Sequence, residues 1–193
     1  MSLLEKLDSE SPSQLRRRSK ESLTWFRNRV RSLKTGARDL YTYSDLTKTS
    51  SYATGKMYTY FYNPKHAQTL PYYDTFPCTI IIDMNQTGFT GLNLHYLPPR
   101  IRILFLNELF KYTNNQEFDE TTRVEASWDL LNSIARLRPA RACIKRYLTP
   151  NVVGQALYIE PQYWDIIAFL PTAQWNNANA LDVYRESREK IDV

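Results

Sequence analysis

Histidine and cysteine are scarce in this chain of 193 residues, with two of each. His66, His95, Cys78 and Cys143 lie far apart in the sequence, and neither cysteine belongs to a C-x-x-C pair. A metal site needs such ligands at close spacing, so we expect no metal ion and no cofactor. The apolar surroundings of the two cysteines predict reduced thiols in a core, and a disulfide is the lesser alternative.

Catalytic constellations are also missing. The sequence shows no Ser–His–Asp or Cys–His arrangement. His95 falls in a predicted strand, where a histidine is more often a hydrogen-bonded structural residue than a base. Asp74 and Asp83 are single carboxylates beside predicted turns, and we interpret both as turn caps. The sequence therefore predicts a protein that is not an enzyme.

Long apolar runs are absent, and no segment approaches the ~20 residues that a membrane-spanning helix needs. Residues 1–8 show no signal-peptide pattern, so we expect a protein made in the cytosol with no membrane partner. Five glycines and ten prolines do not indicate low complexity. At this length the prior is a single domain of about 100–150 residues, with room for an additional segment.

The net charge of +5 is distributed unevenly along the chain. Residues 1–40 carry ten Lys and Arg residues against five Asp and Glu, whereas residues 41–193 carry fifteen of each. All the excess positive charge therefore lies in the first fifth of the chain. Such clustering is typical of a segment that binds a polyanion or an acidic protein surface.

Residues 1–40, which we call the basic arm, are predicted to form an amphipathic helix that starts with Ser11 and Pro12 and ends at Gly36. Its apolar face recurs at helical spacing and is the candidate protein-binding surface: Leu23, Trp25, Phe26, Val30 and Leu33. Its other face is the candidate polyanion-binding surface: Arg16, Arg17, Arg18, Lys20, Arg27, Arg29, Arg31, Lys34 and Arg38. The helix could pack on its own domain. We favour docking elsewhere, because the apolar stripe is narrow and the like charges repel each other.

The rest of the chain predicts a linker and one compact domain. Residues 41–55 are rich in Ser, Thr and Tyr without periodicity, which favours an extended linker before a domain at 56–193. Aromatic and β-branched runs predict strands at 57–62, 79–82, 89–96 and 152–160. We expect an α+β fold, with a small antiparallel sheet packed by several helices.

Local signals place the turns and helices of this domain. A hairpin with a loop of about five residues, 84–88, is predicted between the second and third strands. Pro98 and Pro99 end the sheet. Helical periodicity then predicts helices at 100–110, 120–137, 161–170 and 178–190. In the last of these, Leu181 and Tyr184 are expected to face inward.

Two features of the domain are candidates for binding. The connection 63–77 carries prolines and aromatic residues that favour an ordered loop, and its Tyr72 and Tyr73 are candidate partner-binding residues. A small basic cluster follows much later in the chain, at Arg141, Lys145 and Arg146. It could contact phosphate, or it could equally balance nearby carboxylates.

Five segments of the domain are long and specific: YFYNPK (60–65), LPYYDTFP (70–77), GLNLHYLPPR (91–100), IKRYL (144–148) and EPQYWDIIAFLPT (160–172). Together with the basic helix around Trp25 they resemble a family of small virion-associated proteins of large contractile-tailed bacteriophages. The resemblance spans residues 20–190. It implies a component of the phage particle, either in the tail and baseplate or as a protector of the end of the packaged DNA. It brings no catalytic residues.

The hypothesis that we favour from the sequence is a structural virion protein. In this hypothesis the arm and the aromatic loops dock into the tail, baseplate or neck, and the arm folds as its apolar face enters a groove of a neighbouring subunit. The partners would be other phage structural proteins in a symmetric assembly of many subunits.

The alternative hypothesis is a DNA end protector, whose basic arm binds the packaged genome terminus by neutralising phosphates of double-stranded DNA. Trp25 or Phe26 could stack on an exposed terminal base. Because residues 41–193 carry no net charge and show no obvious groove, DNA affinity would rest on the arm. Under either hypothesis we expect the protein in the virion, after assembly in the host cytoplasm.

Overall fold

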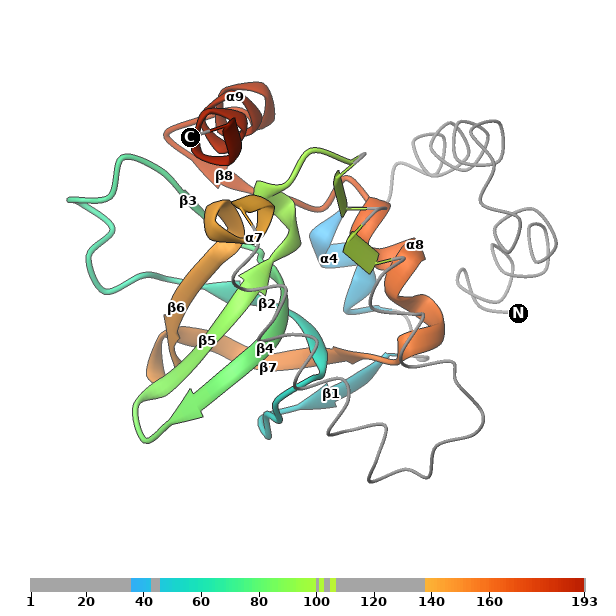
Figure 1. The fold of residues 1–193 in the computed structure, drawn as a ribbon. Helices are drawn as coiled ribbons and strands as arrows, with labels where there is room; N and C mark the ends of the chain where they lie inside the picture. Colours follow the sequence, from blue (N-terminus) through green and yellow to red (C-terminus); the bar gives the residue numbers. More distant parts are fainter. Residues whose placement is uncertain (1–35, 43–45, 100, 103–104, 107–137, 193) are drawn as a thin grey trace, which may run out of the picture.

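The aromatic and β-branched runs form one six-stranded sheet, in which every pair of neighbours is antiparallel (Figure 1). The computed structural model describes residues 36–42, 46–99, 101–102, 105–106 and 138–192. The strand order is β1-β7-β2-β4-β5-β6. The strands are β1 (Thr47–Thr49), β2 (Met57–Tyr62), β4 (Cys78–Asn85), β5 (Gly88–Asn93), β6 (Ile144–Leu148) and β7 (Val152–Ile159). A second sheet pairs β3 (Tyr73–Asp74) with β8 (Trp175–Asn176).

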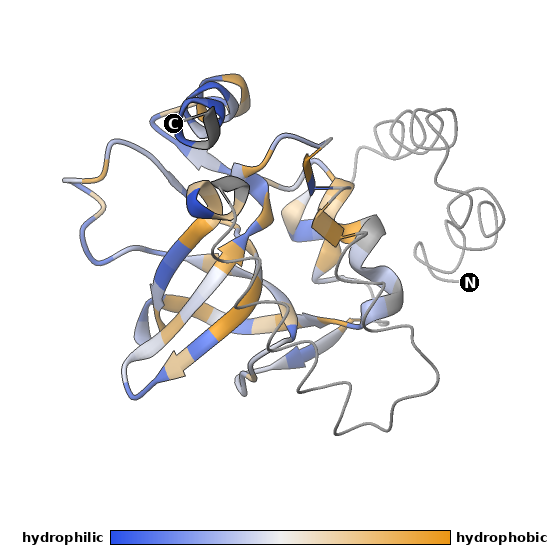
Figure 2. Cartoon of the chain, in the orientation of Figure 1, coloured by the Kyte–Doolittle hydropathy of each residue, from blue (hydrophilic) through white to orange (hydrophobic). Residues whose placement is uncertain are grey.

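Helices cover one side and one end of the large sheet (Figure 1). The α-helices are α4 (Ala37–Leu40), α7 (Arg138–Cys143), α8 (Trp164–Phe169) and α9 (Ala180–Asp192). Short 3₁₀ turns are η1 (Leu94–Tyr96), η2 (Thr149–Asn151) and η3 (Pro161–Tyr163). Figure 2 shows hydrophobic residues along β4 and a mostly hydrophilic surface on α9. The α+β prediction, with an antiparallel sheet packed by helices, is confirmed.

The main core lies between the sheet and the helices. Met57 of β2 pairs with Ile80 of β4, so their side chains lie on the same face of the sheet, and both are fully buried. Leu40 of α4 and Ile167 of α8 pack into the same cluster. Cys78 and Cys143 are buried free thiols, as the sequence predicts.

The other face of the sheet is closed by its own aromatic rings. Tyr60 of β2 packs edge-on against Tyr147 of β6, with ring centroids 5.6 Å apart, although two strands separate β2 from β6. The backbone N–H of Leu148 also donates to the hydroxyl of Tyr62, at 3.1 Å. Such contacts require a strongly curved sheet, as Figure 1 shows. Edge-on aromatic pairs of this kind each add roughly 0.5–1.5 kcal/mol beyond the area they bury.

The β4–β5 hairpin is tighter than predicted. Asn85 pairs with Gly88, so the loop holds Gln86 and Thr87 alone, and the predicted five-residue loop is wrong. The side-chain oxygen of Asn85 accepts hydrogen bonds from the backbone N–H groups of Thr87 and Gly88. These bonds stabilise the two-residue loop. Glycine is required at position 88, because a Cβ there would lie 2.0 Å from the carbonyl oxygen of Tyr147 on β6.

The strand predicted at 89–96 ends early. The side chain of Asn93 accepts a hydrogen bond from the backbone N–H of His95, which starts the turn η1. His95 therefore lies in a 3₁₀ turn, and its prediction as a strand residue is wrong. The prediction that it is a hydrogen-bonded structural residue rather than a base agrees with its complete burial and its contact with Asp74.

The last helix is rotated relative to its prediction. Leu181 is 79% exposed, whereas Val183 and Ser187 are buried. Asn179 caps the helix by accepting from the N–H groups of Leu181 and Asp182, which fixes the start of the helix and turns Leu181 outward. Tyr184 is half-buried, so the inward placement is wrong for Leu181 and partly right for Tyr184.

Part of the predicted linker belongs to the sheet. Strand β1 pairs with β7, and Leu46 is buried beside it. Gly36, predicted as a helix end, is the N-cap of α4, whose Ala37 and Leu40 are buried. The linker prediction at 41–55 is therefore corrected at residues 46–49, where the backbone joins the sheet and Leu46 enters the core. The division of the chain at residue 40 stays a prediction.

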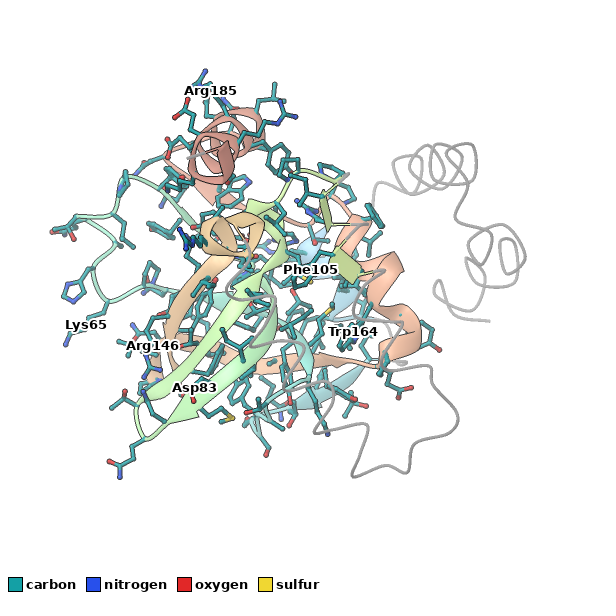
Figure 3. The ribbon with its side chains drawn as sticks, in the orientation of Figure 1. Lys65, Asp83, Phe105, Arg146, Trp164 and Arg185 are labelled. Carbon is teal, nitrogen blue, oxygen red and sulfur yellow. The ribbon has the colours of Figure 1, made fainter. Side chains whose placement is uncertain are left out.

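Several predicted elements fall outside the described residues. These are the helix of the basic arm up to residue 35, the helix at 120–137 and most of the helix at 100–110. In the last segment, Ile101, Arg102, Phe105 and Leu106 are helical, and the last three are buried. Figure 3 shows Phe105 on the side of the sheet that carries α8 and Trp164.

Candidate nucleic-acid interface

A cleft of about 490 Å³ opens between the connection 63–72 and strand β6. Its walls combine tyrosine rings with basic side chains, and we call it the tyrosine–lysine cleft. The end of α9 adds Lys190, and η1 adds Tyr96. The lining residues are Tyr62, Pro64, Lys65, His66, Leu70, Pro71, Tyr72, Tyr73, Asp74, Tyr96, Lys145, Arg146, Tyr147, Leu148 and Lys190.

Four basic side chains border the cleft. Lys65, Arg146 and Lys190 are exposed, and Lys145 is partly buried. Figure 3 shows Lys65 on the loop and Arg146 on β6 at the same side of the molecule. Within the part of the chain that the structure describes, none of the four forms an ion pair with a carboxylate. Of the predicted basic cluster, Lys145 lies within reach of the charge of Glu186, and Arg141 lies near Glu186 and Glu189, so both interpretations of the cluster stay open.

Lys145 is held in place from two directions. Its Nζ donates to the carbonyl oxygen of Ala142 at 3.0 Å and lies 4.1 Å from the centroid of the Tyr96 ring. A cation over a tyrosine face is attracted by the electron density of the ring. An ammonium group has three donors, so this arrangement leaves at least one N–H for a ligand in the cleft.

The tyrosines of the cleft are fixed by their hydroxyl groups. Tyr72 donates to Glu186 at 2.7 Å, and the hydroxyl of Tyr73 accepts from Asn176 at 2.6 Å. The ring of Tyr72 lies 6.1 Å from that of Tyr96 and 6.0 Å from that of Trp175. Tyr72 and Tyr73 are both partly exposed, so ring surface remains available at the cleft.

Asp74 forms the centre of a buried polar network at the back of the cleft. Its carboxylate accepts from the backbone N–H groups of Phe76 and Gln174, at 2.9 and 3.1 Å, and from the side-chain amide of Asn93, at 3.2 Å. It also lies 2.6 Å from Nδ1 of His95. Because a carboxylate only accepts, Nδ1 carries the proton. The turn-cap interpretation of Asp74 covers one of these contacts, that with Phe76, and misses the rest.

The arrangement continues to a hydroxyl group but does not form a reactive site. Oγ1 of Thr172 lies 3.4 Å from Nε2 of His95, which gives the order Thr172–His95–Asp74. All three side chains are buried, with Thr172 at 1% exposure and His95 at 0%. A substrate cannot reach this hydroxyl, so we interpret the three residues as a structural network.

Asp83, the other predicted turn cap, is an exposed residue of β4, and Asn85 caps the hairpin instead.

Arg102 ties the turn η1 to the C-terminal helices. Its buried guanidinium donates to the carbonyl oxygens of Leu97, Ala168 and His95 and to the hydroxyl of Tyr184, at 2.7–3.0 Å. Burial lowers the pKa of this guanidinium. These four bonds hold the backbone of His95, and so the Asp74 network, against α8 and α9.

The pKa of Lys145 predicts how the free energy of unfolding changes with pH. Burial, and then the nearby charge of Lys190, lower the pKa of Lys145 from 10.5 to about 8, while Cys143 and Glu186 act in the opposite direction. Between pH 8 and 10.5 the unfolded chain keeps a proton that the folded chain has lost, so this group makes the free energy of unfolding rise with pH. Below pH 8 the full cost of burying the charge remains.

We therefore expect Lys145→Met to raise the free energy of unfolding by about 1–3 kcal/mol at pH 7, and by less at pH 9.5. Urea unfolding of both proteins across this range measures the difference. Burial also raises the pKa values of Cys78 and Tyr60, which Lys145 does not affect, so these groups cancel in the comparison. The charge of Lys145 lowers the pKa of Cys143, which burial raises to about 12, so this thiol stays protonated over the range in both proteins. A difference that stays constant with pH would show that the Lys145 ammonium bears no burial cost.

The sequence-predicted binding residues fall into two groups. Tyr72 and Tyr73 line the cleft, as do Lys145 and Arg146 of the basic cluster, whereas Arg141 lies on α7 near Glu186 and Glu189. Arg38 is exposed on α4. The remaining candidates precede residue 36 and lie outside the described residues: Arg16, Arg17, Arg18, Lys20, Leu23, Trp25, Phe26, Arg27, Arg29, Val30, Arg31, Leu33 and Lys34.

Sequence reasoning missed Lys65, Tyr96, Tyr147 and Lys190, which come from four separate elements. It also predicted no groove outside the arm, because the charge count over residues 41–193 hides a local gathering of cations. In the described ranges, no group of three or more His, Cys, Asp or Glu residues could hold a metal ion. Among these same residues, no helix is long and apolar enough to cross a membrane.

A model of the phage T4 terminal DNA protecting protein family matches residues 4–185. The chain belongs to this family. The match includes almost all of the basic arm and every residue of the cleft except Lys190, so both basic regions lie within the family's sequence pattern. It confirms the predicted relation to phage proteins, in the DNA-protecting form, and gives no support to a place in the tail or baseplate. No curated protein and no solved structure matches the chain.

Proposed function

We propose that this protein binds the ends of linear double-stranded phage DNA and shields them from exonucleases. The observation that carries this proposal is the match to the terminal DNA protecting family over residues 4–185. The charge distribution supports it, because the nine basic residues between Arg16 and Arg38 can neutralise DNA phosphates without reading sequence. A protector of genome ends needs this tolerance of sequence.

Protection in this proposal is by occupancy, without a chemical step. The Thr172–His95–Asp74 series is buried, and the cleft is lined mainly by basic side chains and phenol groups, which can hold DNA without a chemical step. A bound protein excludes an exonuclease from the end for as long as it stays bound. Slow dissociation from the end is therefore the property that the function requires.

The test asks whether unlabelled DNA competes for the protein in proportion to its number of ends or to its total length. A labelled linear duplex is bound by the full chain, and the same mass of unlabelled DNA is added as long fragments, short fragments or closed circles. Competition that rises with the number of ends, together with protection of the labelled DNA from exonuclease digestion, supports the proposal. Competition that follows total length alone, or a lack of protection, would overturn it.

Two arm variants separate DNA binding from protein docking. We expect the triple variant Arg16→Ala, Arg17→Ala, Arg18→Ala to lose most protection, while Phe26→Ala with Val30→Ala retains it. The reverse pattern would favour the competing hypothesis, in which the apolar stripe docks into another virion protein. Both variants leave residues 36–193 unchanged. We therefore expect both to keep the folded domain, so that a difference in protection reports on the arm.

A further inference from the structure

We infer that the tyrosine–lysine cleft holds the terminal nucleotide of the bound DNA, with its phosphate on the cleft's lysines and its base against Tyr72. This inference rests on the proposed function and extends it, because it assigns the recognition of an end to a site in the folded domain. The basic arm would supply affinity for any DNA, and the cleft would supply the preference for a terminus.

The size of the cleft selects an end over the interior of a duplex. A volume of about 490 Å³ is in the range of sites that take one small ligand. A nucleotide inside a duplex must leave its stack to enter such a site, which costs a few kcal/mol and costs least where the base is already unpaired. A frayed or overhanging terminal nucleotide meets this condition, whereas an internal base pair does not.

The cations of the cleft suit a terminal phosphate. Lys145 is oriented by Ala142 and Tyr96, and Lys190 lies close enough for its charge to act on Lys145. A phosphate between them would offset this repulsion. A terminal phosphate carries more charge than the single charge of an internal diester, so lysine donors favour it. Arg146 is partly occupied by Asn85 and Thr87 of the hairpin and borders the site as a further positive charge.

The aromatic side of the cleft suits a base. Tyr72 is partly exposed, its ring is backed by Tyr96 and Trp175, and its hydroxyl is tied to Glu186. A ring fixed in this way loses little freedom when a base stacks on it, and stacking accepts any of the four bases. Because the Glu186 carboxylate lies at this hydroxyl and would repel a phosphate, we assign the base to Tyr72 and the phosphate to the lysines.

The test uses DNA hairpins with one open end that carries a short overhang. Three versions differ at that end alone: a 5′-phosphate, a 3′-phosphate or hydroxyl groups on both strands. We expect the wild-type chain to bind one phosphorylated version about tenfold more tightly than the hydroxyl version, as one charge-assisted contact provides. Whichever phosphate gives the gain identifies the strand that enters. Equal binding of all three versions would overturn the inference.

Variants of the cleft assign this preference to its residues. Lys145→Met combined with Lys190→Gln should abolish the phosphate preference, and Tyr72→Leu should weaken binding of overhanging ends more than binding of closed circles. Arg188→Gln is the matched control for Lys190→Gln, because each removes one positive charge from an exposed position of α9 and Arg188 does not line the cleft. If Arg188→Gln reduces the preference as much as the double variant, the cleft does not carry it.

The two proposals fail in distinguishable ways. If the wild-type chain shows no preference for ends over circles, the proposed function fails. If it prefers ends and the double variant keeps both that preference and the phosphate effect, only the cleft assignment fails. Unfolding curves of each variant check that a loss of binding is not a loss of fold, and Lys145→Met is expected to be no less stable than the wild type.

Lys145 also provides a readout that a structural role would not change. The phosphate preference should fall between pH 7 and pH 9 as Lys145 loses its proton in the setting of Tyr96, Cys143, Glu186 and Lys190. In Lys145→Arg the charge remains over this range, so the preference should not change with pH. A wild-type preference that stays constant from pH 7 to pH 9, as in Lys145→Arg, would show that the preference does not depend on proton loss from Lys145.

Discussion

Replacing Asp74 with alanine is expected to lower the free energy of unfolding by about 3–5 kcal/mol. The carboxylate is almost fully buried and serves as acceptor for Phe76, Gln174, Asn93 and His95. Alanine would leave all four donors without their acceptor in the interior, where each unsatisfied group costs about 1–3 kcal/mol.

Urea unfolding at neutral pH measures this loss, and Asp83→Ala is its control. Asp83 is also a strand aspartate, but it is exposed, and exposed substitutions usually stay within about 0.5 kcal/mol. A loss below 1 kcal/mol for Asp74→Ala would mean that the network rearranges to satisfy its donors. Because Asp74 lines the cleft and Asn93 also donates to the Tyr147 hydroxyl, the same substitution should disturb the cleft wall.

The parts of the fold that follow from local sequence were predictable. Strands β2 and β7 coincide closely with the predictions at 57–62 and 152–160, because aromatic and β-branched runs between turn residues restrict the backbone to extended geometry. The helical segment before Pro171 was predictable for a similar reason, since prolines stand on both sides of it. These signals lie within a few residues of the structure that they specify.

The predictions of element boundaries were wrong where a side chain forms a hydrogen bond with a backbone group close to it in the sequence. Asn85 tightened the hairpin, Asn93 ended strand β5, and Asn179 set the start of α9. Asparagine competes for backbone hydrogen bonds in each case, and residue patterns alone do not show which partner it chooses. In α9 the helix start set by Asn179 exposes Leu181, although the hydrophobic pattern of the sequence predicted that Leu181 faces inward.

The cleft could not be predicted, because it depends on contacts between distant parts of the chain. Its cations come from a loop, a strand and a helix, at positions 65, 145, 146 and 190. The curvature that brings β6 toward β2 arises from rings such as Tyr60 and Tyr147, which are far apart in sequence. Tyr72 and Tyr73 were selected for their place in an aromatic loop, and they do line the cleft. What binds there remains a prediction.

DNA binding by the full chain is expected to weaken by about 10³–10⁵-fold when the salt concentration rises from 50 to 200 mM. The basic arm carries nine Lys and Arg residues between Arg16 and Arg38, and each phosphate that it neutralises releases condensed counterions. If all nine take part, the slope of log affinity against log salt approaches roughly −8. Fluorescence anisotropy of a labelled duplex at a series of salt concentrations measures this slope.

The triple variant at Arg16, Arg17 and Arg18 should reduce the magnitude of the slope by about 2.7, since each lost phosphate contact removes about 0.9. The double variant at Lys145 and Lys190 should reduce it by no more than about 2, yet abolish the preference for a phosphorylated end. The arm and the cleft therefore affect different observables, affinity for any DNA and choice of a terminus. A slope unchanged in the triple variant would mean that these arginines do not contact phosphate. The affinity would then have to come from the six other basic residues between Lys20 and Arg38 or from the folded domain, where the four cations of the cleft alone could give a slope of no more than about −3.6.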